Sequence, residues 1–243
     1  MHDSGHFDEW ADRYDGSVRR LEGYPFEGYD RVLEQIVHLA APRATHHILD
    51  LGIGTGNLAA RFAVLGCRIS GIDFSVRMLA VAANKVPGAR LARADIRGPW
   101  PPEFSGPYDR IVSAYTFHHL DLSAKVRLLV RLFDVHLVAG GCIVVGDVCF
   151  PTPAALREER ARVREAWDES EHYWVATETV VACTQAGLQA EHSQISRCAG
   201  VCVFRRPSPT TPCDCSRSVV CGRVRYEYGA LRRHGGTRAE RRA

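Results

Sequence analysis

Between residues 46 and 149, short apolar runs alternate with segments in which apolar residues recur at helical spacing. The apolar runs are nearly continuous, as is typical of parallel strands that helices cover on both faces. Strands that alternate with helices indicate repeated β-α units around one parallel sheet. The pattern therefore predicts five strands in this region, at His47–Leu51, Arg68–Ile72, Arg90–Ala94, Arg110–Ala114 and Cys142–Val148.

The helices between these strands carry start and stop signals. Ser75 and Ser123 are of the residue type that caps a helix N-terminus, and Gly66 is of the type that follows a helix end. We predict three helices here, at Asn57–Leu65, from Ser75 to about Lys85, and from Ser123 through Leu137, where the pair Gly140–Gly141 ends the pattern.

Other elements flank this region. An aromatic-rich lead precedes an amphipathic stretch, Tyr29–Ala40, which Pro42 stops. After the fifth strand comes a charged helical segment, Ala154–Ser170, in which Glu and Arg alternate as on a solvated helix face. The chain then predicts a helix at Glu178–Ala186 and a closing antiparallel pair at Gln189–Arg197 and Gly200–Arg206.

These elements predict a Rossmann-like α/β fold. We expect an N-terminal lid and helix over residues 1–45 and an α/β domain over 46–206, with a helical insertion at 151–175. Residues 207–243 contain little apolar periodicity and are rich in Pro, Gly and Arg, so we expect a disordered tail.

Composition favours a soluble protein of the cytoplasm. The chain is 46% hydrophobic and 24% charged, and no apolar run approaches the ~18–20 residues that a membrane helix needs. Its N-terminus lacks the basic-then-apolar order of a signal peptide. The nine cysteines are scattered, and several lie in apolar runs, which favours reduced thiols that pack as small hydrophobes.

Charge is concentrated in the tail. Eight Arg against three acids give residues 207–243 a net +5, so with +3 overall the first 206 residues carry −2. A near-neutral domain has no electrostatic footprint for nucleic acid. Three tail cysteines, Cys213, Cys215 and Cys221, lack a second ligand pair at a structural zinc spacing, so we predict no metal site.

The most informative segment is the end of the first strand, where Gly52, Gly54 and Gly56 stand at alternate positions before a helix. Glycine allows a positive φ and a close approach of a ligand to the main chain. Dinucleotide-binding folds use G-x-G-x-x-G, but Asn57 stands where the third glycine of that pattern belongs. The spacing therefore disfavours a nicotinamide oxidoreductase, which remains an alternative.

Three acids lie at or just after the C-terminal ends of the first three strands. Asp50 suits a ligand with positive charge, since it would repel a pyrophosphate. Asp73 ends the second strand, where a carboxylate can accept both hydroxyls of a ribose, although it can also be a plain helix cap. Asp95, after the third strand, can accept an adenine amino group or be a turn residue.

With the segments Phe7–Asp15 (FDEWADRYD) and Ser113–Leu120 (SAYTFHHL), these features resemble the class I S-adenosylmethionine-dependent methyltransferases, closest to a group of bacterial small-molecule enzymes. The resemblance covers about residues 6–206. It implies a seven-stranded, mostly parallel sheet with helices on both faces and an antiparallel last strand. It also implies S-adenosyl-L-methionine as cofactor, bound by Tyr14, Asp50, Gly52, Gly54, Gly56, Asp73, Phe74, Asp95, Ile96 and Ser113.

Methyl transfer from a sulfonium requires little covalent chemistry, because the methyl group is already activated. The protein must place a nucleophile in line with the S–CH₃ bond and exclude water. If the acceptor is a hydroxyl or amine, His118 or His119 is a candidate base, since histidine titrates near neutral pH. The alternative is that one of them packs structurally and the other binds the backbone. His172 is a further candidate if the insertion covers the pocket.

The acceptor, the atom methylated and the oligomeric state are not determined by the sequence. We expect a small-molecule acceptor, with neither nucleic acid nor membrane as partner. Two alternatives stay open: an RNA-modifying methyltransferase that uses the basic tail, and a catalytically silent protein that only binds S-adenosylmethionine.

Overall fold

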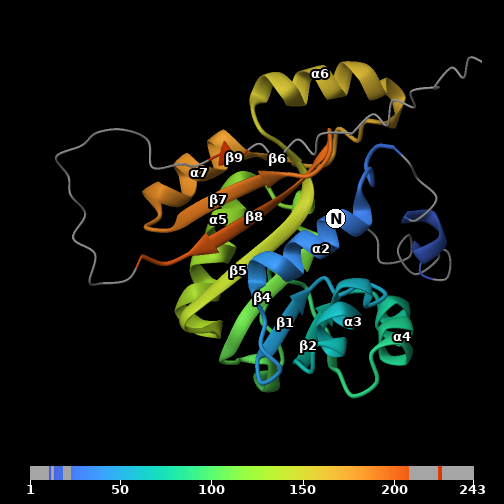
Figure 1. The fold of residues 1–243 in the computed structure, drawn as a ribbon, viewed down its shortest axis with the longest axis vertical. Coiled ribbons are helices and arrows are strands. Elements are labelled where there is room, and N and C mark those ends of the chain that lie inside the picture. Colours follow the sequence, from blue (N-terminus) through green and yellow to red (C-terminus); the bar gives the residue numbers. More distant parts are fainter. Residues whose placement is uncertain (1–10, 12–13, 19–22, 208–223, 226–243) are drawn as a thin grey trace, which may run out of the picture.

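The computed structural model describes residues 11, 14–18, 23–207 and 224–225. Its strands form one sheet in the order β3-β2-β1-β4-β5-β8-β7-β9, with β6 paired to β5 (Figure 1). The strands are β1 (His47–Leu51), β2 (Arg68–Asp73), β3 (Arg90–Arg93), β4 (Tyr108–Ala114), β5 (Leu137–Phe150), β6 (Trp174–Val175), β7 (Gln189–Gln194), β8 (Ala199–Arg205) and β9 (Val224–Arg225).

The sheet is parallel except at β8. Strands β3, β2, β1, β4 and β5 pair in parallel, whereas β8 runs antiparallel to both β5 and β7. The Rossmann-like, mostly parallel sheet with an antiparallel C-terminal part is therefore confirmed. The structure adds two strands of two residues each, β6 and β9, to the seven that were expected.

Helices cover both faces of the sheet. They are α2 (Tyr29–Ala40), α3 (Asn57–Val64), α4 (Val76–Lys85), α5 (Leu122–Arg131), α6 (Pro153–Val163) and α7 (Ala176–Gln185), with short turns η1 (Pro102–Phe104), η2 (Phe117–His119), η3 (Leu132–His136) and η4 (Arg164–Ala166). One apolar cluster joins the sheet to α2, α3 and α4, and a second joins it to α5 and α7. In β5, Val144 belongs to the first cluster and Ile143 and Val145 to the second, because side chains alternate along a strand.

The long helix predicted from Ser123 through Leu137 is shorter than expected. Its N-cap is Asp121, whose carboxylate accepts a hydrogen bond from the Ala124 amide at 2.7 Å. The helix ends at Arg131 and continues as the π-turn η3, and β5 begins at Leu137, which pairs with Tyr108 of β4. Pairing with β4 therefore overrides the helical pattern at the C-terminal end of this segment.

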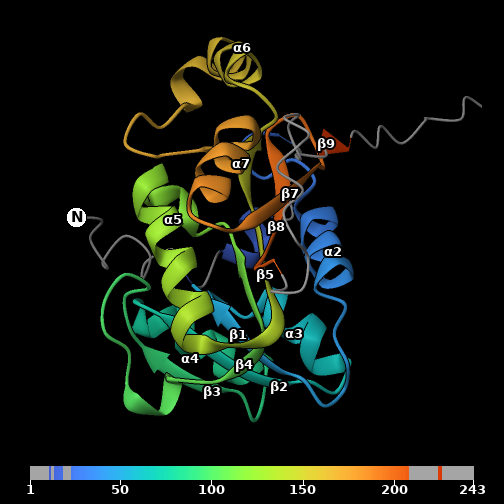
Figure 2. The ribbon, with the colours of Figure 1, turned by 90° about the vertical axis from the view of Figure 1, so that its left-hand side faces the viewer.

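The insertion after β5 is also shorter in helix than its charge pattern predicted. Helix α6 ends at Val163, where Arg164 takes a positive φ of 48°, and residues 167–173 return to the sheet without regular structure. Figures 1 and 2 show α6 standing above the rest of the molecule.

The return segment packs on the N-terminal lead through aromatic contacts. The ring of Tyr24 stacks on Trp167 with 5.8 Å between centroids, and its hydroxyl donates to that of Tyr173 at 2.5 Å. Two regions far apart in the sequence thus lie together at one end of the sheet.

None of the helices in the described part of the chain is both long enough and apolar enough to cross a membrane. The prediction of a disordered tail falls almost entirely outside the described residues. The two tail residues of β9 pair in parallel with β7.

Candidate functional site

The glycine turn after β1 is held in a conformation that other residues rarely adopt. Gly52, Gly54 and Gly56 have φ of 68°, 55° and 83°, and Gly56 is the N-cap of α3. A Cβ on Gly52 would lie 2.2 Å from the Thr116 hydroxyl oxygen, which is too close for two atoms that are not bonded to each other. Gly52 therefore meets both demands made on glycine here, the positive φ and the close approach.

Asp73 ties this turn to the end of β2. Its Oδ2 accepts a hydrogen bond from the Gly54 amide and its Oδ1 one from the Ser75 amide, both at 2.9 Å. The residue is only 6% exposed but lines a large cavity. The predicted ribose-binding acid therefore stands at the cavity wall and also shapes the glycine turn.

Asp50 lies deeper than its predicted role suggested. It is 1% exposed and lines a separate cavity of about 30 Å³ beneath the glycine turn. Burial, and then the charge of Asp73, raise the pKa of Asp50 to about 8. Its Oδ2 accepts no hydrogen bond within the described part of the chain. A cation placed beside it would stabilise the ionised form.

The main cavity has a volume of about 1090 Å³ and extends from the glycine turn to the turn η2. Of the residues predicted for the site, it is lined by Tyr14, Gly52, Gly54, Asp73, Phe74, Asp95, Ile96, His118 and His119. Sequence reasoning also named His172, which lines it too. A single cavity thus contacts seven of the ten predicted donor residues and the predicted base candidates.

Besides Asp50, two predicted donor residues do not line the main cavity. Ser113 is fully buried and donates its hydroxyl proton to the carbonyl of Leu51 at 2.6 Å, so it joins β4 to β1 and does not line the cavity. Gly56 shapes the turn, where an added Cβ would lie 3.3 Å from Val86, and it too is absent from the cavity wall.

Asp95 lines the cavity but already has a partner. The guanidinium of Arg97 donates to both of its oxygens, at 3.0 Å and 2.6 Å. These hydrogen bonds hold the pKa of the Asp95 carboxyl below its usual value. In this arrangement a ligand amino group would compete with Arg97 for the carboxylate.

His118 is held by Asp147, a residue that the sequence analysis did not single out. The carboxylate of Asp147 lies 2.6 Å from Nδ1 of His118 and also accepts the His118 amide at 3.0 Å. Burial alone would lower the pKa of His118, but the charge and hydrogen bond of Asp147 and the charge of Glu171 together raise it. Since Nδ1 faces Asp147, Nε2 is the nitrogen available to a ligand. The signal that was missed is a polar residue inside the apolar run of β5.

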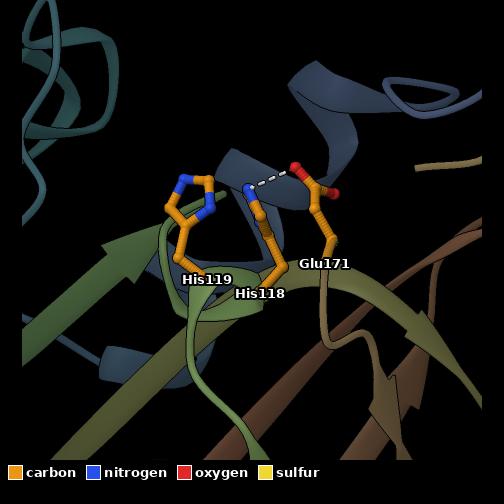
Figure 3. A group of neighbouring side chains, drawn as sticks. All are labelled: His118, His119 and Glu171. Atoms are coloured by element: carbon orange, nitrogen blue, oxygen red, sulfur yellow. Dashed lines mark ion pairs between the residues drawn. The ribbon is translucent and has the colours of Figure 1, made fainter. Parts of the chain in front are cut away.

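Glu171, also missed, lies on the other side of His118 (Figure 3). Its Oε1 is 3.4 Å from Nε2 of His118, and the ligand atoms of His118, His119 and Glu171 all lie within 4.8 Å of one another. The segment that carries Glu171 is attached to η2, because the amide of His172 donates to the carbonyl of His118 at 2.7 Å. The carbonyl of the same residue, His172, accepts a hydrogen bond from the buried ammonium of Lys125.

The N-terminal lead is fastened to the glycine turn through Asp15. One of its oxygens accepts hydrogen bonds from the Thr55 hydroxyl at 2.7 Å and the Asn57 amide at 3.0 Å. The other pairs with the ammonium of Lys85 at 2.5 Å. The neighbouring Tyr14 lines the cavity. Most of the sequence motif Phe7–Asp15 lies outside the described residues; the network of Asp15 holds the end of this motif against the glycine turn.

Comparisons with known proteins identify the family of this chain. Residues 48–141 match the family model described as a methyltransferase domain. The chain is 36% identical over 203 residues to an uncharacterized methyltransferase of Geobacillus kaustophilus, covering 77% of this chain and 89% of that protein. It is 32% identical over 178 residues to the uncharacterized methyltransferase YrrT of Bacillus subtilis, covering 69% of this chain and 80% of that one.

The fold is similar to that of a solved structure titled DhpI-SAH complex. The TM-score is 0.63 at 17% sequence identity, and the match covers 85% of this chain and 95% of that one. At this identity the likeness concerns the fold.

Proposed function

Since this chain belongs to the class I S-adenosylmethionine-dependent methyltransferases, we propose that it transfers the sulfonium methyl group to a small-molecule acceptor held near His118 and His119. S-adenosylmethionine is the donor of this family. The observation that carries the proposal is the single cavity that joins the glycine turn and Asp73 to the two histidines.

The donor end suits a cationic nucleoside. Asp73 offers a carboxylate at the cavity wall for the ribose, and Phe74 and Ile96 line the same wall, where an adenine ring would be sandwiched. Asp50 supplies a buried acid whose ionised form the donor's positive charge would favour. These residues support binding of S-adenosylmethionine with its methyl group directed toward η2.

The acceptor end suits a molecule of limited size. The cavity there is walled by the lead, through Pro25 and Phe26, and by the return segment, through Asp168 and Glu171. Aromatic contacts between Tyr24 and Trp167 join these two walls. Such walls favour an acceptor that enters the cavity and is shielded from water, as in-line transfer requires.

The histidines would handle the acceptor's proton. Asp147 fixes the ring of His118 with Nε2 toward the cavity, as a carboxylate orients a catalytic imidazole. Asp147 would act as a positioning residue, since it contacts His118 and not the cavity.

The test has two parts. Calorimetric titration with S-adenosylhomocysteine should give one binding site, which Asp73→Ala weakens at least tenfold. Asp95→Ala should weaken it less, because Asp95 already pairs with Arg97. Incubation with methyl-labelled donor and a host metabolite extract should then yield a labelled small molecule, with turnover reduced in His118→Asn and His119→Asn. Binding without any labelled product would overturn methyl transfer, and label in RNA alone would overturn the small-molecule acceptor.

A further inference from the structure

We propose that His118, His119 and Glu171 form a binding site for a divalent transition-metal cation, with an oxygen or nitrogen atom of the acceptor as its remaining ligand. The cation site itself is independent of the proposed function; the acceptor's part in it rests on that function. The sequence analysis predicted no metal site, and that prediction rested on the cysteines of the tail; His118, His119 and Glu171 come together only in the folded chain.

The three side chains are arranged as ligands around one point. Figure 3 shows His118 between the other two, and all three ligand atoms lie within 4.8 Å of one another. The distance of 3.4 Å between His118 Nε2 and Glu171 Oε1 exceeds that of a normal charge-assisted hydrogen bond, roughly 2.7–2.9 Å. Two ligands at ~2.1 Å from a tetrahedral cation lie about 3.4 Å apart. The pair therefore has the spacing of two ligands that share a metal.

Asp147 supplies the support that a metal-binding histidine usually has. Metal-bound imidazoles commonly donate their other N–H to a carboxylate, which fixes the tautomer and the ring orientation. Asp147 lies 2.6 Å from Nδ1 of His118 and is itself held by the amides of His118 and Val148. It is 1% exposed, so this support is fixed inside the protein.

The backbone holds the two ligand-bearing segments together. The His172 amide donates to the His118 carbonyl at 2.7 Å, which sets Glu171 against η2. Lys125, 1% exposed and stacked 4.4 Å over the Trp174 ring, donates to the His172 carbonyl. The segment that carries Glu171 is thus held against η2 by a main-chain hydrogen bond and by the buried Lys125 side chain.

The donor set indicates the kind of cation. Two imidazoles and one carboxylate, with a position left open, are the ligands of catalytic zinc sites and of non-haem iron sites. The open side is the cavity, which all three residues line. A hydroxyl, carboxylate or amine of the acceptor could bind there, and the cation would lower the proton affinity of that group. With the cation bound, His118 and His119 act as its ligands, and this role replaces the base role that we propose above for the metal-free site.

The test is metal binding by the full chain after treatment with a chelator. We expect one equivalent of Zn²⁺ by calorimetry, and with Co²⁺ an absorption spectrum of a site with nitrogen and oxygen ligands and no thiolate charge-transfer band. His119→Ala and Glu171→Gln should each weaken Zn²⁺ binding at least tenfold. His38→Ala, which removes an exposed imidazole on α2, should leave it unchanged.

A titration of each variant with S-adenosylhomocysteine shows whether the fold is intact. The proposal is overturned if the parent binds no Co²⁺, or if its spectrum shows thiolate ligands and survives both ligand substitutions. Failure to bind Zn²⁺ with normal binding of S-adenosylhomocysteine would reject the metal site and leave the proposed function standing. The opposite result would reject the proposed function and keep the metal site.

Discussion

The two ends of the cavity are built in different ways. The proposed donor end consists of consecutive β-α turns, in which Gly52 and Gly54 follow β1 and Asp73 ends the adjacent strand β2. The proposed acceptor end combines three distant segments: η2 with His118, β5 with Asp147, and the return segment with Glu171. The residues of the proposed donor end can therefore be predicted from a local sequence motif. Those of the proposed acceptor end come together only in the folded sheet.

This comparison leads to a first prediction, with the largest expected effect. Asp147→Asn should lower turnover by roughly 10²–10⁴-fold, because His118 loses the carboxylate that orients its ring. The affinity for S-adenosylhomocysteine should stay within twofold of the parent. Steady-state kinetics with the identified acceptor, paired with calorimetry, measure both quantities. An equal loss of donor affinity would mean that the two ends are not separable.

Gly52→Ala addresses the donor end. The added Cβ would overlap the Thr116 hydroxyl and the positive φ would be strained, which together cost about 2 kcal/mol or more. We expect the turn to shift to relieve this strain, so that binding of S-adenosylhomocysteine, which needs the original turn, weakens by about 30-fold. The matched control is Gly88→Ala, where φ is 87° but nothing lies within 4 Å of the added Cβ. This control should lose some thermal stability and keep its donor affinity. Normal donor binding by Gly52→Ala would show that the turn is not closely packed.

The pH dependence of donor binding tests Asp50. Its pKa of about 8 in the donor-free protein, raised by burial and by Asp73, means that binding of a cation beside it releases a proton below that pH. Donor affinity should therefore rise by up to about tenfold per pH unit as pH increases toward 8, and then level off. Because the pKa of Asp50 is higher in the folded protein than the value of about 4 in the unfolded chain, the free energy of unfolding of the donor-free protein falls as pH rises from about 4 toward 8.

Calorimetry at several pH values measures the slope, and Asp50→Asn should remove it. The control Asp30→Asn changes an exposed carboxylate on α2 and should keep the slope. A slope that persists in Asp50→Asn would assign the released proton to another group.

The smallest effect is expected for the network that fastens the lead. Lys85→Met removes a partly exposed ion pair with Asp15, and such pairs contribute about 0.2–1 kcal/mol, so we expect a loss of donor affinity of about 1.4- to fivefold. Arg160→Met, which breaks an exposed pair with Glu169 beside α6, should have no effect on donor binding. Equal effects of the two substitutions would show that the lead does not contribute to the donor end.

Predictability followed the same division between local and distant contacts. The amphipathic pattern gave α2 its observed bounds, and Ser75 caps α4 by accepting the Met78 amide. The predicted bounds of helices and strands were wrong where pairing between distant strands sets them, as at the start of β5, which pairs with β4. Asp95 and Ser113 show the same limit, because their contacts with Arg97 and with the Leu51 carbonyl are set by packing that no motif records.

The sequence by itself determined the order of strands and helices, the glycine turn and the acids that follow the first strands. These features depend on periodicity and on backbone conformations that few residues adopt, both of which are properties of neighbouring positions. Only the tertiary structure decided that Asp147 and Glu171 flank His118, and that the lead and the return segment close one cavity. Contacts between segments far apart in the chain depend on the packing of the whole sheet, so a local sequence pattern does not predict them.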